Sequence, residues 1–141
     1  MNNFIFQNAT KVYFGKGCVK EYLACLTKNA NTILLAYGGG SIKKTGVYDE
    51  ITGILKEAGK TMVEFSGIMS NPTYAKVQEG AKLARDNNVD MILAVGGGSV
   101  MDCCKAVSLA ARYDGDIWDD FWARPGVIDF EPLPLGVVVT V

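Results

Sequence analysis

Short, continuously apolar runs alternate along the chain with segments whose apolar residues recur at helical spacing. The runs at residues 32–37 (TILLAY) and 91–95 (MILAV) have strand length, and the sequence GGGS follows each of them. Strands without polar interruption are typical of parallel sheets buried on both faces, and the glycines predict sharp turns. A shorter strand is expected at residues 61–65, and a valine-rich one at residues 135–141.

Three segments outside these strands have helical periodicity. Apolar residues recur every three or four positions over residues 47–58, 73–87 and 99–113. Gly59 is placed to end the first helix, and the sequence Asn71-Pro72-Thr73 is placed to open the second. Strands that alternate with helices predict an α/β fold, here a Rossmann-like open, mainly parallel sheet with helices on both faces.

The segment after the third predicted helix combines turn residues with three large aromatic side chains. Trp118, Phe121 and Trp122 are expected to pack together as a local cluster. The chain then enters the valine-rich strand and stops at Val141. A strand this apolar normally needs cover on both faces and a functional loop at its carboxyl end. We therefore expect residues 1–141 to be one domain at the N-terminal end of a longer protein.

Composition and charge exclude several classes of partner. The 141 residues are 49% hydrophobic and 21% charged, which fits one folded domain, and the net charge is −1. A nearly neutral chain gives no electrostatic reason to expect nucleic acid or a membrane surface as a partner. No apolar run approaches the roughly 20 residues of a membrane-spanning helix, and the N-terminus does not resemble a secretory signal. A cytoplasmic location is expected.

Cysteine and histidine usage limits the chemistry further. The four cysteines have no CxxC spacing and are expected to be reduced, structural thiols: Cys18, Cys25, Cys103 and Cys104. The chain contains no histidine, which removes the commonest general base and the commonest metal ligand. Any imidazole ligand of a metal must therefore come from outside this chain.

The two GGGS turns are the candidate binding chemistry. They begin at Gly38 and Gly96, 58 positions apart, at the carboxyl ends of predicted buried strands. Glycine lets a backbone approach a phosphate closely, and a following helix presents free N–H groups and a positive dipole end. Ser99 can cap its helix or donate its hydroxyl to an anion. Neither turn has the GxGxxG or P-loop pattern, so phosphate binding and plain tight turns both remain open.

Four pieces of sequence together resemble one protein family. They are FGKG at residues 14–17, YGGGS with KKTG at 37–46, Asn71-Pro72, and GGGSVMD with Lys105 at 96–105. In this order they resemble the iron-containing (group III) alcohol dehydrogenases, and most closely the butanol dehydrogenase branch. The resemblance covers nearly the whole chain. It corresponds only to the N-terminal dinucleotide-binding domain of that family, a domain of the dehydroquinate synthase-like type.

The resemblance implies a domain that binds NAD(P) for the interconversion of small aldehydes and primary alcohols. A divalent metal, iron or zinc, would be held by an Asp and three His in a C-terminal helical domain that this chain lacks. The resemblance therefore implies no catalytic residue and no metal ligand among residues 1–141. The full-length protein would be a homodimer. Four N-terminal residues would contribute to its interface or, alternatively, pack within their own chain: Phe4, Phe6, Val12 and Tyr13. The alternatives are a glycerol dehydrogenase or dehydroquinate synthase relative, and a non-catalytic nucleotide-binding module if 141 residues is the natural length.

Matching positions imply nine cofactor-binding residues. They are Gly38, Gly39, Ser41, Asn71, Gly97, Gly98, Ser99, Asp102 and Thr140. Gly97, Gly98 and Ser99 would hold the pyrophosphate, and Asp102 would lie near the nicotinamide. Instead of contacting the cofactor, Asp102 could be an ordinary carboxylate in the first turn of its helix, favoured by the helix dipole. Asn71 could likewise be part of a plain Asn-Pro turn that opens a helix.

The turn after the first strand predicts which dinucleotide binds. An acidic residue there would accept from the ribose 2′-hydroxyl of NAD and repel the 2′-phosphate of NADP. NAD-preferring relatives have Asp at the position of Gly39, whereas Gly38, Gly39 and Ser41 leave room for a phosphate. Lys43 and Lys44 lie nearby, either as counter-charges or as a solvated surface pair. NADP(H) is therefore predicted over NAD(H).

Overall fold

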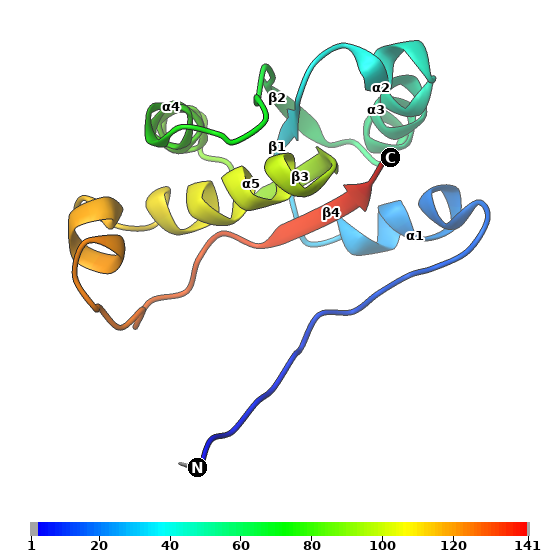
Figure 1. The fold of residues 1–141 in the computed structure, drawn as a ribbon. Helices are drawn as coiled ribbons and strands as arrows, with labels where there is room; N and C mark the ends of the chain where they lie inside the picture. The colour runs from blue at the N-terminus through cyan, green and yellow to red at the C-terminus, as the bar shows by residue number, and fades with distance from the viewer. Residues whose placement is uncertain (1–2, 141) are drawn as a thin grey trace.

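Four parallel strands form one open sheet in the computed structural model, which describes residues 3–140 (Figure 1). The strands are β1 (Thr32–Tyr37), β2 (Thr61–Phe65), β3 (Met91–Gly96) and β4 (Leu135–Val139). Their spatial order is β2-β1-β3-β4, and each neighbouring pair is parallel. The predicted α/β fold with a parallel sheet is confirmed.

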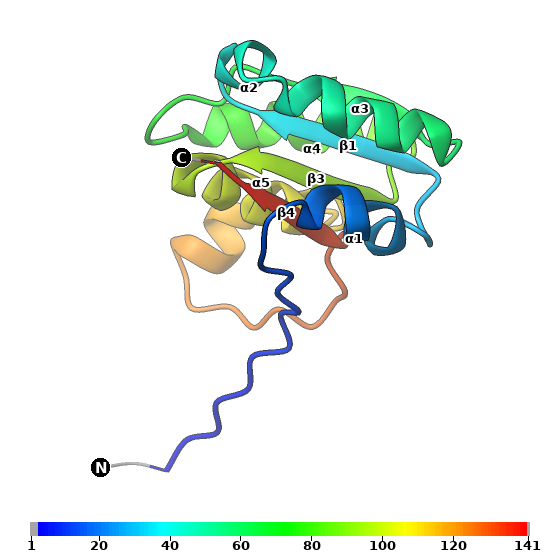
Figure 2. The ribbon, with the colours of Figure 1, turned by 90° about the vertical axis from the view of Figure 1, so that its right-hand side faces the viewer.

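Helices cover both faces of this sheet. The helices are α1 (Cys18–Leu26), α2 (Ser41–Lys44), α3 (Val47–Glu57), α4 (Tyr74–Asp86) and α5 (Gly98–Ala110), followed by a π-helical turn, η1 (Trp118–Trp122). α1 and α3 pack on one face, and α4 and α5 pack on the other (Figure 2). Alternate residues of β1 and β3 supply the two cores, because successive side chains of a strand point to opposite faces. The uninterrupted apolar runs therefore follow from burial on both sides.

Local signals place the helix ends as predicted. The Thr73 hydroxyl accepts a hydrogen bond from the backbone N–H of Lys76 at 3.3 Å and so caps α4. Gly59 follows α3 with φ +72°, a left-handed conformation that glycine adopts without steric cost. The predicted helices at 47–58, 73–87 and 99–113 correspond to α3, α4 and α5.

The prediction that the three aromatic side chains around η1 pack together is wrong. Phe121 packs against Tyr113, with ring centroids 4.9 Å apart, whereas Trp118 lies against Tyr74 at 5.9 Å. Trp118 and Trp122 remain 51% and 50% exposed. Phe121 and Trp118 therefore each pack on a ring outside the segment instead of on one another.

Strand β4 is covered less completely than its sequence predicts. It pairs with β3 alone, and Val139 is 68% exposed. The hydrogen-bond ladder continues one residue further, because the backbone N–H of Thr140 donates to the Gly96 carbonyl oxygen at 3.1 Å. Val141, the last residue of the predicted strand, lies outside the described residues.

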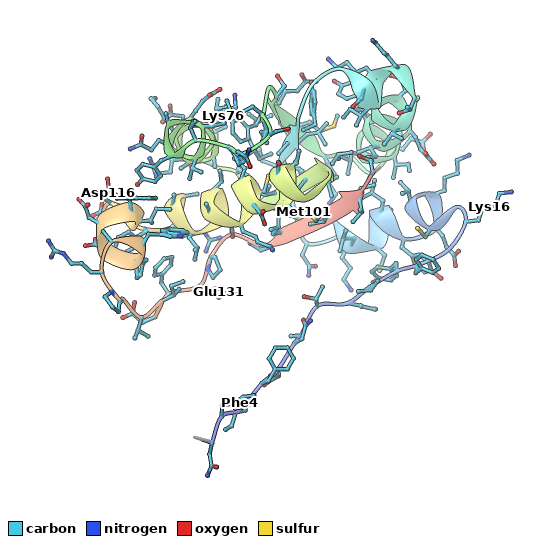
Figure 3. The ribbon with its side chains drawn as sticks, in the orientation of Figure 1. Phe4, Lys16, Lys76, Met101, Asp116 and Glu131 are labelled. Carbon is cyan, nitrogen blue, oxygen red and sulfur yellow. The ribbon has the colours of Figure 1, made fainter. Side chains whose placement is uncertain are left out.

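The N-terminal residues form an arm that leads away from the sheet (Figures 1 and 2). Phe4, Phe6 and Val12 are 81%, 81% and 76% exposed, and Phe4 projects from the arm as Figure 3 shows. Tyr13 instead stacks on Tyr22 of α1, with ring centroids 4.6 Å apart. The intrachain alternative therefore holds for Tyr13, and a dimer interface stays a prediction for the other three.

All four cysteines are free thiols, but Cys25 is exposed and Cys18 is half-buried, so a structural role stays a prediction for these two. Cys103 and Cys104 are buried between α5 and the sheet, and this burial raises the pKa of Cys104 to about 12. Reactive cysteines need a stabilised thiolate, so these two thiols serve packing. Within residues 3–140, no helix has the length and apolarity required to cross a membrane.

Gly80 allows α4 to pack closely against its neighbours, and we expect Gly80→Ala to destabilise the fold. An added Cβ would lie 2.7 Å from Cε1 of Phe65 and 2.8 Å from Cγ2 of Val107, both buried. The free energy of unfolding should fall by about 1–2 kcal/mol, because overpacking outweighs the gain in helix propensity. Urea unfolding followed by circular dichroism measures this change.

The matched control is Gly53→Ala in α3. A Cβ at Gly53 would meet nothing within 4 Å, so alanine should stabilise the chain by about 0.5–1 kcal/mol. If both substitutions stabilised the chain equally, the close packing at Gly80 would be contradicted.

Candidate cofactor-binding site

The carboxyl ends of β1, β3 and β4 bring most of the predicted site residues to one edge of the sheet. β1 leads directly into Gly38, β3 into Gly97 and β4 into Thr140. A Cβ on Gly97 would lie 3.9 Å from the carbonyl oxygen of Thr140, which shows how close the last two turns are. Ligands of open α/β sheets bind outside this edge.

The turn after β3 has the backbone geometry of an anion site. Gly97 is the N-cap of α5 and provides no side-chain cap. The N–H groups of Gly98, Ser99 and Val100 have no backbone acceptor among the described residues, as is usual in the first turn of a helix. A Cβ on Gly98 would meet nothing within 4 Å, so the space beside it is open. This backbone fits the pyrophosphate of a dinucleotide.

The glycines of this turn have different roles. A Cβ on Gly96 would lie 2.6 Å from Cγ2 of Val100, so Gly96 is required for the strand and the helix to meet closely. Gly97 and Gly98 are exposed and have no such clash. Gly96 therefore supports the turn, while Gly97 and Gly98 present its backbone.

Two alternatives from the sequence are wrong at α5. Ser99 is the second residue of the helix and not its N-cap, so its hydroxyl does not cap α5. Asp102 lies beyond the first turn, with its Oδ1 3.7 Å from Nζ of Lys105, and both side chains are exposed. Such an exposed pair contributes little to stability. A role of Ser99 and Asp102 toward a cofactor stays a prediction.

The turn after β1 is held by the loop that follows β2. The backbone N–H of Gly67 donates to the carbonyl oxygen of Gly38 at 2.9 Å, and a Cβ on Gly38 would lie 3.1 Å from the carbonyl oxygen of Ile68. Gly39 is exposed and its Cβ would meet nothing within 4 Å. Ser41, also exposed, begins α2. This edge therefore has room at Gly39 and Ser41 but not at Gly38.

Asn71 occupies the loop between β2 and α4. Its φ is +52°, in the left-handed region that asparagine tolerates better than most residues. This conformation agrees with the alternative of a turn ahead of the Thr73 cap. A cofactor contact of Asn71 stays a prediction.

Sequence reasoning missed a polar cluster beside the β1 turn. Glu64 accepts hydrogen bonds from the hydroxyls of Tyr37, at 2.8 Å, and Tyr48. The Tyr48 and Tyr37 bonds lower the pKa of Glu64, and the bond to Glu64 together with burial raises the pKa of Tyr48 to about 12. Nζ of Lys43 lies 4.7 Å from the centroid of the Tyr48 ring. Lys43 therefore packs on tyrosine, while both Lys43 and Lys44 are exposed to solvent.

This edge of the sheet provides binding groups and no metal centre. Among residues 3–140, no group of three or more His, Cys, Asp or Glu side chains could hold a metal ion. The groups available near the strand ends are backbone N–H donors, the hydroxyls of Ser41, Ser99 and Thr140, and the exposed carboxylate of Asp102. They can bind and orient an anionic ligand.

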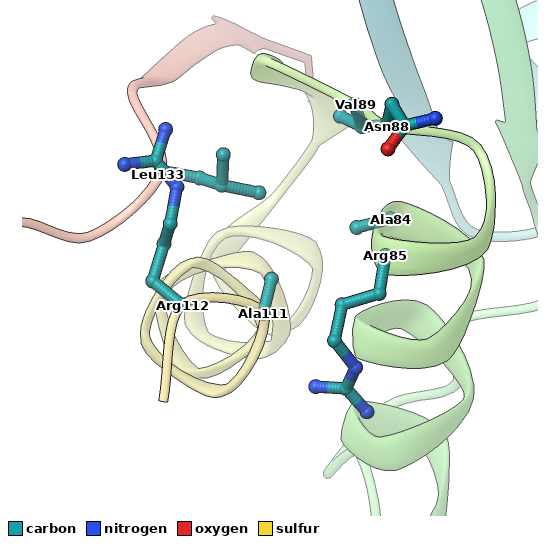
Figure 4. A pocket seen from close by; sticks show the side chains of 7 residues that line it. All are labelled: Ala84, Arg85, Asn88, Val89, Ala111, Arg112 and Leu133. Carbon is teal, nitrogen blue, oxygen red and sulfur yellow. The ribbon is translucent and has the colours of Figure 1, made fainter. Parts of the chain in front are cut away.

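A separate cavity of about 240 Å³ lies at the opposite edge of the sheet, near the ends of α4 and α5 (Figure 4). Its lining residues are Ala84, Arg85, Asn88, Val89, Ala111, Arg112 and Leu133. Nη1 of Arg85 donates to the carbonyl oxygen of Ala110 at 2.8 Å, which satisfies a free carbonyl at the end of α5. None of the predicted site residues lines this cavity.

Fold and glycine turns define an α/β domain of the open parallel-sheet type, and comparison with known proteins identifies its family. Residues 9–141 match the family described as iron-containing alcohol dehydrogenase. The chain belongs to the iron-containing alcohol dehydrogenase family, as its sequence motifs predict, and it is butanol dehydrogenase-like.

Individual relatives agree with this assignment. The chain is 46% identical over 140 residues to the probable NADH-dependent butanol dehydrogenase 2 of Bacillus subtilis, covering 99% of this chain and 35% of that protein. It is 40% identical over 143 residues to the NADPH-dependent aldehyde reductase YqhD of Escherichia coli, covering 99% of this chain and 36% of that protein. The crystal structure of NADH-dependent butanol dehydrogenase A from Thermotoga maritima matches with a TM-score of 0.89 and 43% identity, covering 100% of this chain and 35% of that one.

The chain thus spans about a third of the length of these relatives and corresponds to their N-terminal domain. The relatives include proteins named for NADH and proteins named for NADPH. Membership of the family therefore leaves the choice between the two dinucleotides to the residues of the site.

Proposed function

We propose that this chain is the cofactor-binding domain of a metal-dependent NAD(P)H alcohol dehydrogenase or aldehyde reductase that acts on small aldehydes and primary alcohols. The observation that carries the proposal is the first turn of α5. Within residues 3–140 the N–H groups of Gly98, Ser99 and Val100 have no backbone acceptor, and the space beside Gly98 is open, at the edge where the four parallel strands end. Family membership supports the reaction class.

Each site residue has a stated part in this proposal. Backbone N–H groups of Gly98 and Ser99, with the Ser99 hydroxyl and the turn at Gly97, would bind the pyrophosphate. The adenosine side would meet the β1 turn and its neighbours: Gly38, Gly39, Ser41 and Asn71. Thr140 would border the cleft and Asp102 would lie toward the nicotinamide, which when bound supplies or accepts the hydride.

Residues outside this set would bind the metal and polarise the substrate. Iron or zinc would polarise the carbonyl from a site outside this chain, which contains no histidine. The exposed arm residues Phe4, Phe6 and Val12 would contribute to a homodimer of the full-length protein.

NADP(H) is the proposed cofactor in preference to NAD(H). Gly39 is exposed and has no neighbour for a Cβ within 4 Å, so a 2′-phosphate would meet neither bulk nor an acidic side chain at that position. Lys44, exposed on the adjoining helix, would add a positive charge near this turn.

Calorimetric titration of the protein expressed from its complete gene should show binding of both dinucleotides, with NADPH bound about tenfold more tightly than NADH. The difference reflects charge-assisted hydrogen bonds to the extra phosphate. Tighter binding of NADH would reverse the cofactor assignment and leave the domain assignment intact. Failure of the folded protein to bind either dinucleotide would contradict the proposed function.

A further inference from the structure

Four side chains form a network beside the β1 turn, which we call the Glu64 cluster: Tyr37, Lys43, Tyr48 and Glu64. The carboxylate of Glu64 accepts from both tyrosine hydroxyls, at 2.8 Å from Tyr37. The two rings meet edge to face with centroids 5.8 Å apart. Nζ of Lys43 lies 4.7 Å from the centroid of the Tyr48 ring and 5.5 Å from that of Tyr37.

Two members of the cluster flank, in sequence, the turn at which a 2′-phosphate is proposed to bind. Tyr37 directly precedes residues 38–41, and Lys43 follows them on α2. Tyr48 is on α3 and Glu64 is on β2, so the Glu64 carboxylate connects three elements, β1, α3 and β2. Lys43 on α2 joins them through the rings of Tyr37 and Tyr48. Glu64 is therefore linked to Lys43 through the two tyrosines on which Lys43 packs.

The cluster contains two opposite charges, on Glu64 and on Lys43. Hydrogen bonds from Tyr48 and Tyr37 lower the pKa of Glu64, so it is a carboxylate at neutral pH. Contact with Tyr37 and attraction to Glu64 raise the pKa of Lys43, so it stays an ammonium. The positive charge of Lys43 is thus engaged by the rings and by Glu64, where cation–π and Coulomb attraction add.

We propose that Glu64 is a specificity-determining residue for the cofactor, because it retains Lys43 on the tyrosine rings and so limits the attraction of this turn for a 2′-phosphate. The inference rests on the proposed function and adds a determinant outside the glycine turn. NADH has no phosphate at this position, so its binding depends little on either charge.

Glu64→Gln tests the proposal in the protein expressed from its complete gene. Glutamine keeps the size of the side chain and one acceptor for a tyrosine hydroxyl but removes the charge. Dissociation constants are measured for NADPH and NADH. The preference for NADPH, given by the ratio of the NADH to the NADPH dissociation constant, should be about fivefold larger than in the unsubstituted protein. This gain should shrink as salt screens the charges.

Two further variants separate charge from structure. Glu57→Gln, at the exposed end of α3, makes the same change of net charge and should leave the NADPH to NADH ratio unchanged. The double variant Lys43→Gln with Glu64→Gln should lose the gain, because Lys43 is the group that is released. Thermal unfolding of each variant shows that it is folded.

The outcomes are distinguishable. If the cluster had only a structural role, Glu64→Gln would leave the ratio of the NADPH and NADH dissociation constants unchanged, whether or not binding of both became weaker. That result overturns the inference. A gain that persists in the double variant also overturns it, since Lys43 would not be responsible. If the unsubstituted protein bound neither dinucleotide, the proposed function and this inference would both fall.

Discussion

Gly98→Val is expected to abolish dinucleotide binding while the chain stays folded. A Cβ at this position meets nothing within 4 Å and the φ of Gly98 is outside the left-handed region, so the protein itself accommodates valine. The branched side chain would instead occupy the space in front of the N–H groups that begin α5. Loss of several charge-assisted hydrogen bonds to the pyrophosphate should lower the affinity for both NADPH and NADH by about 100-fold or more.

Calorimetry with both dinucleotides measures this loss, and circular dichroism confirms the fold. Gly53→Val is the matched control, because Gly53 also lies in a helix with no neighbour for its Cβ within 4 Å but is remote in sequence from both turns. That variant should bind as the unsubstituted protein does. A folded Gly98→Val variant with unchanged affinity would show that the α5 turn is not the phosphate site.

The fold was predictable because its signals are local. β1 and β3 are uninterrupted apolar runs, and such runs in alternation with helical periodicity leave few architectures besides a covered parallel sheet. Gly59 and Thr73 mark helix ends through their own backbone and side-chain chemistry. Helix α2 has only four residues, too few for periodicity to reveal it.

The candidate site was predictable only in part. Glycine turns at strand ends indicate where a phosphate could bind, but not which glycine is needed for packing. Gly96 is distinguished from Gly98 by the position of Val100, which depends on how α5 packs against β3. The residue sequence also allowed Ser99 to be a helix cap, and the start of α5 at Gly98 excludes that role.

The Glu64 cluster could not be read from the sequence. Its members come from β1, α2, α3 and β2 and meet only because β2 pairs with β1 while α2 and α3 fold back over the same face. From the sequence, Lys43 is one of two adjacent lysines with no sign of a packing partner. Its position over two tyrosine rings is a property of the tertiary structure.

Gly39→Asp is expected to reverse the cofactor preference. Gly39 is exposed, its φ lies outside the left-handed region and an added Cβ meets nothing within 4 Å, so aspartate enters without strain. The new carboxylate would accept a hydrogen bond from the ribose 2′-hydroxyl of NADH and repel the 2′-phosphate of NADPH. It would also add a second negative charge near Glu64. Affinity for NADPH should fall by about 100-fold, and affinity for NADH should rise severalfold.

Gly39→Asn is the matched control, because it adds nearly the same volume without the charge. It should weaken NADPH much less than aspartate does, and raising the salt concentration should narrow the difference between the two variants. Equal losses in both variants would show that bulk at Gly39 excludes the phosphate, and that charge at this turn does not select the dinucleotide. If NADPH affinity were unaffected by aspartate, the 2′-phosphate would have to bind away from the β1 turn, and Glu64 would then have no means of influencing it.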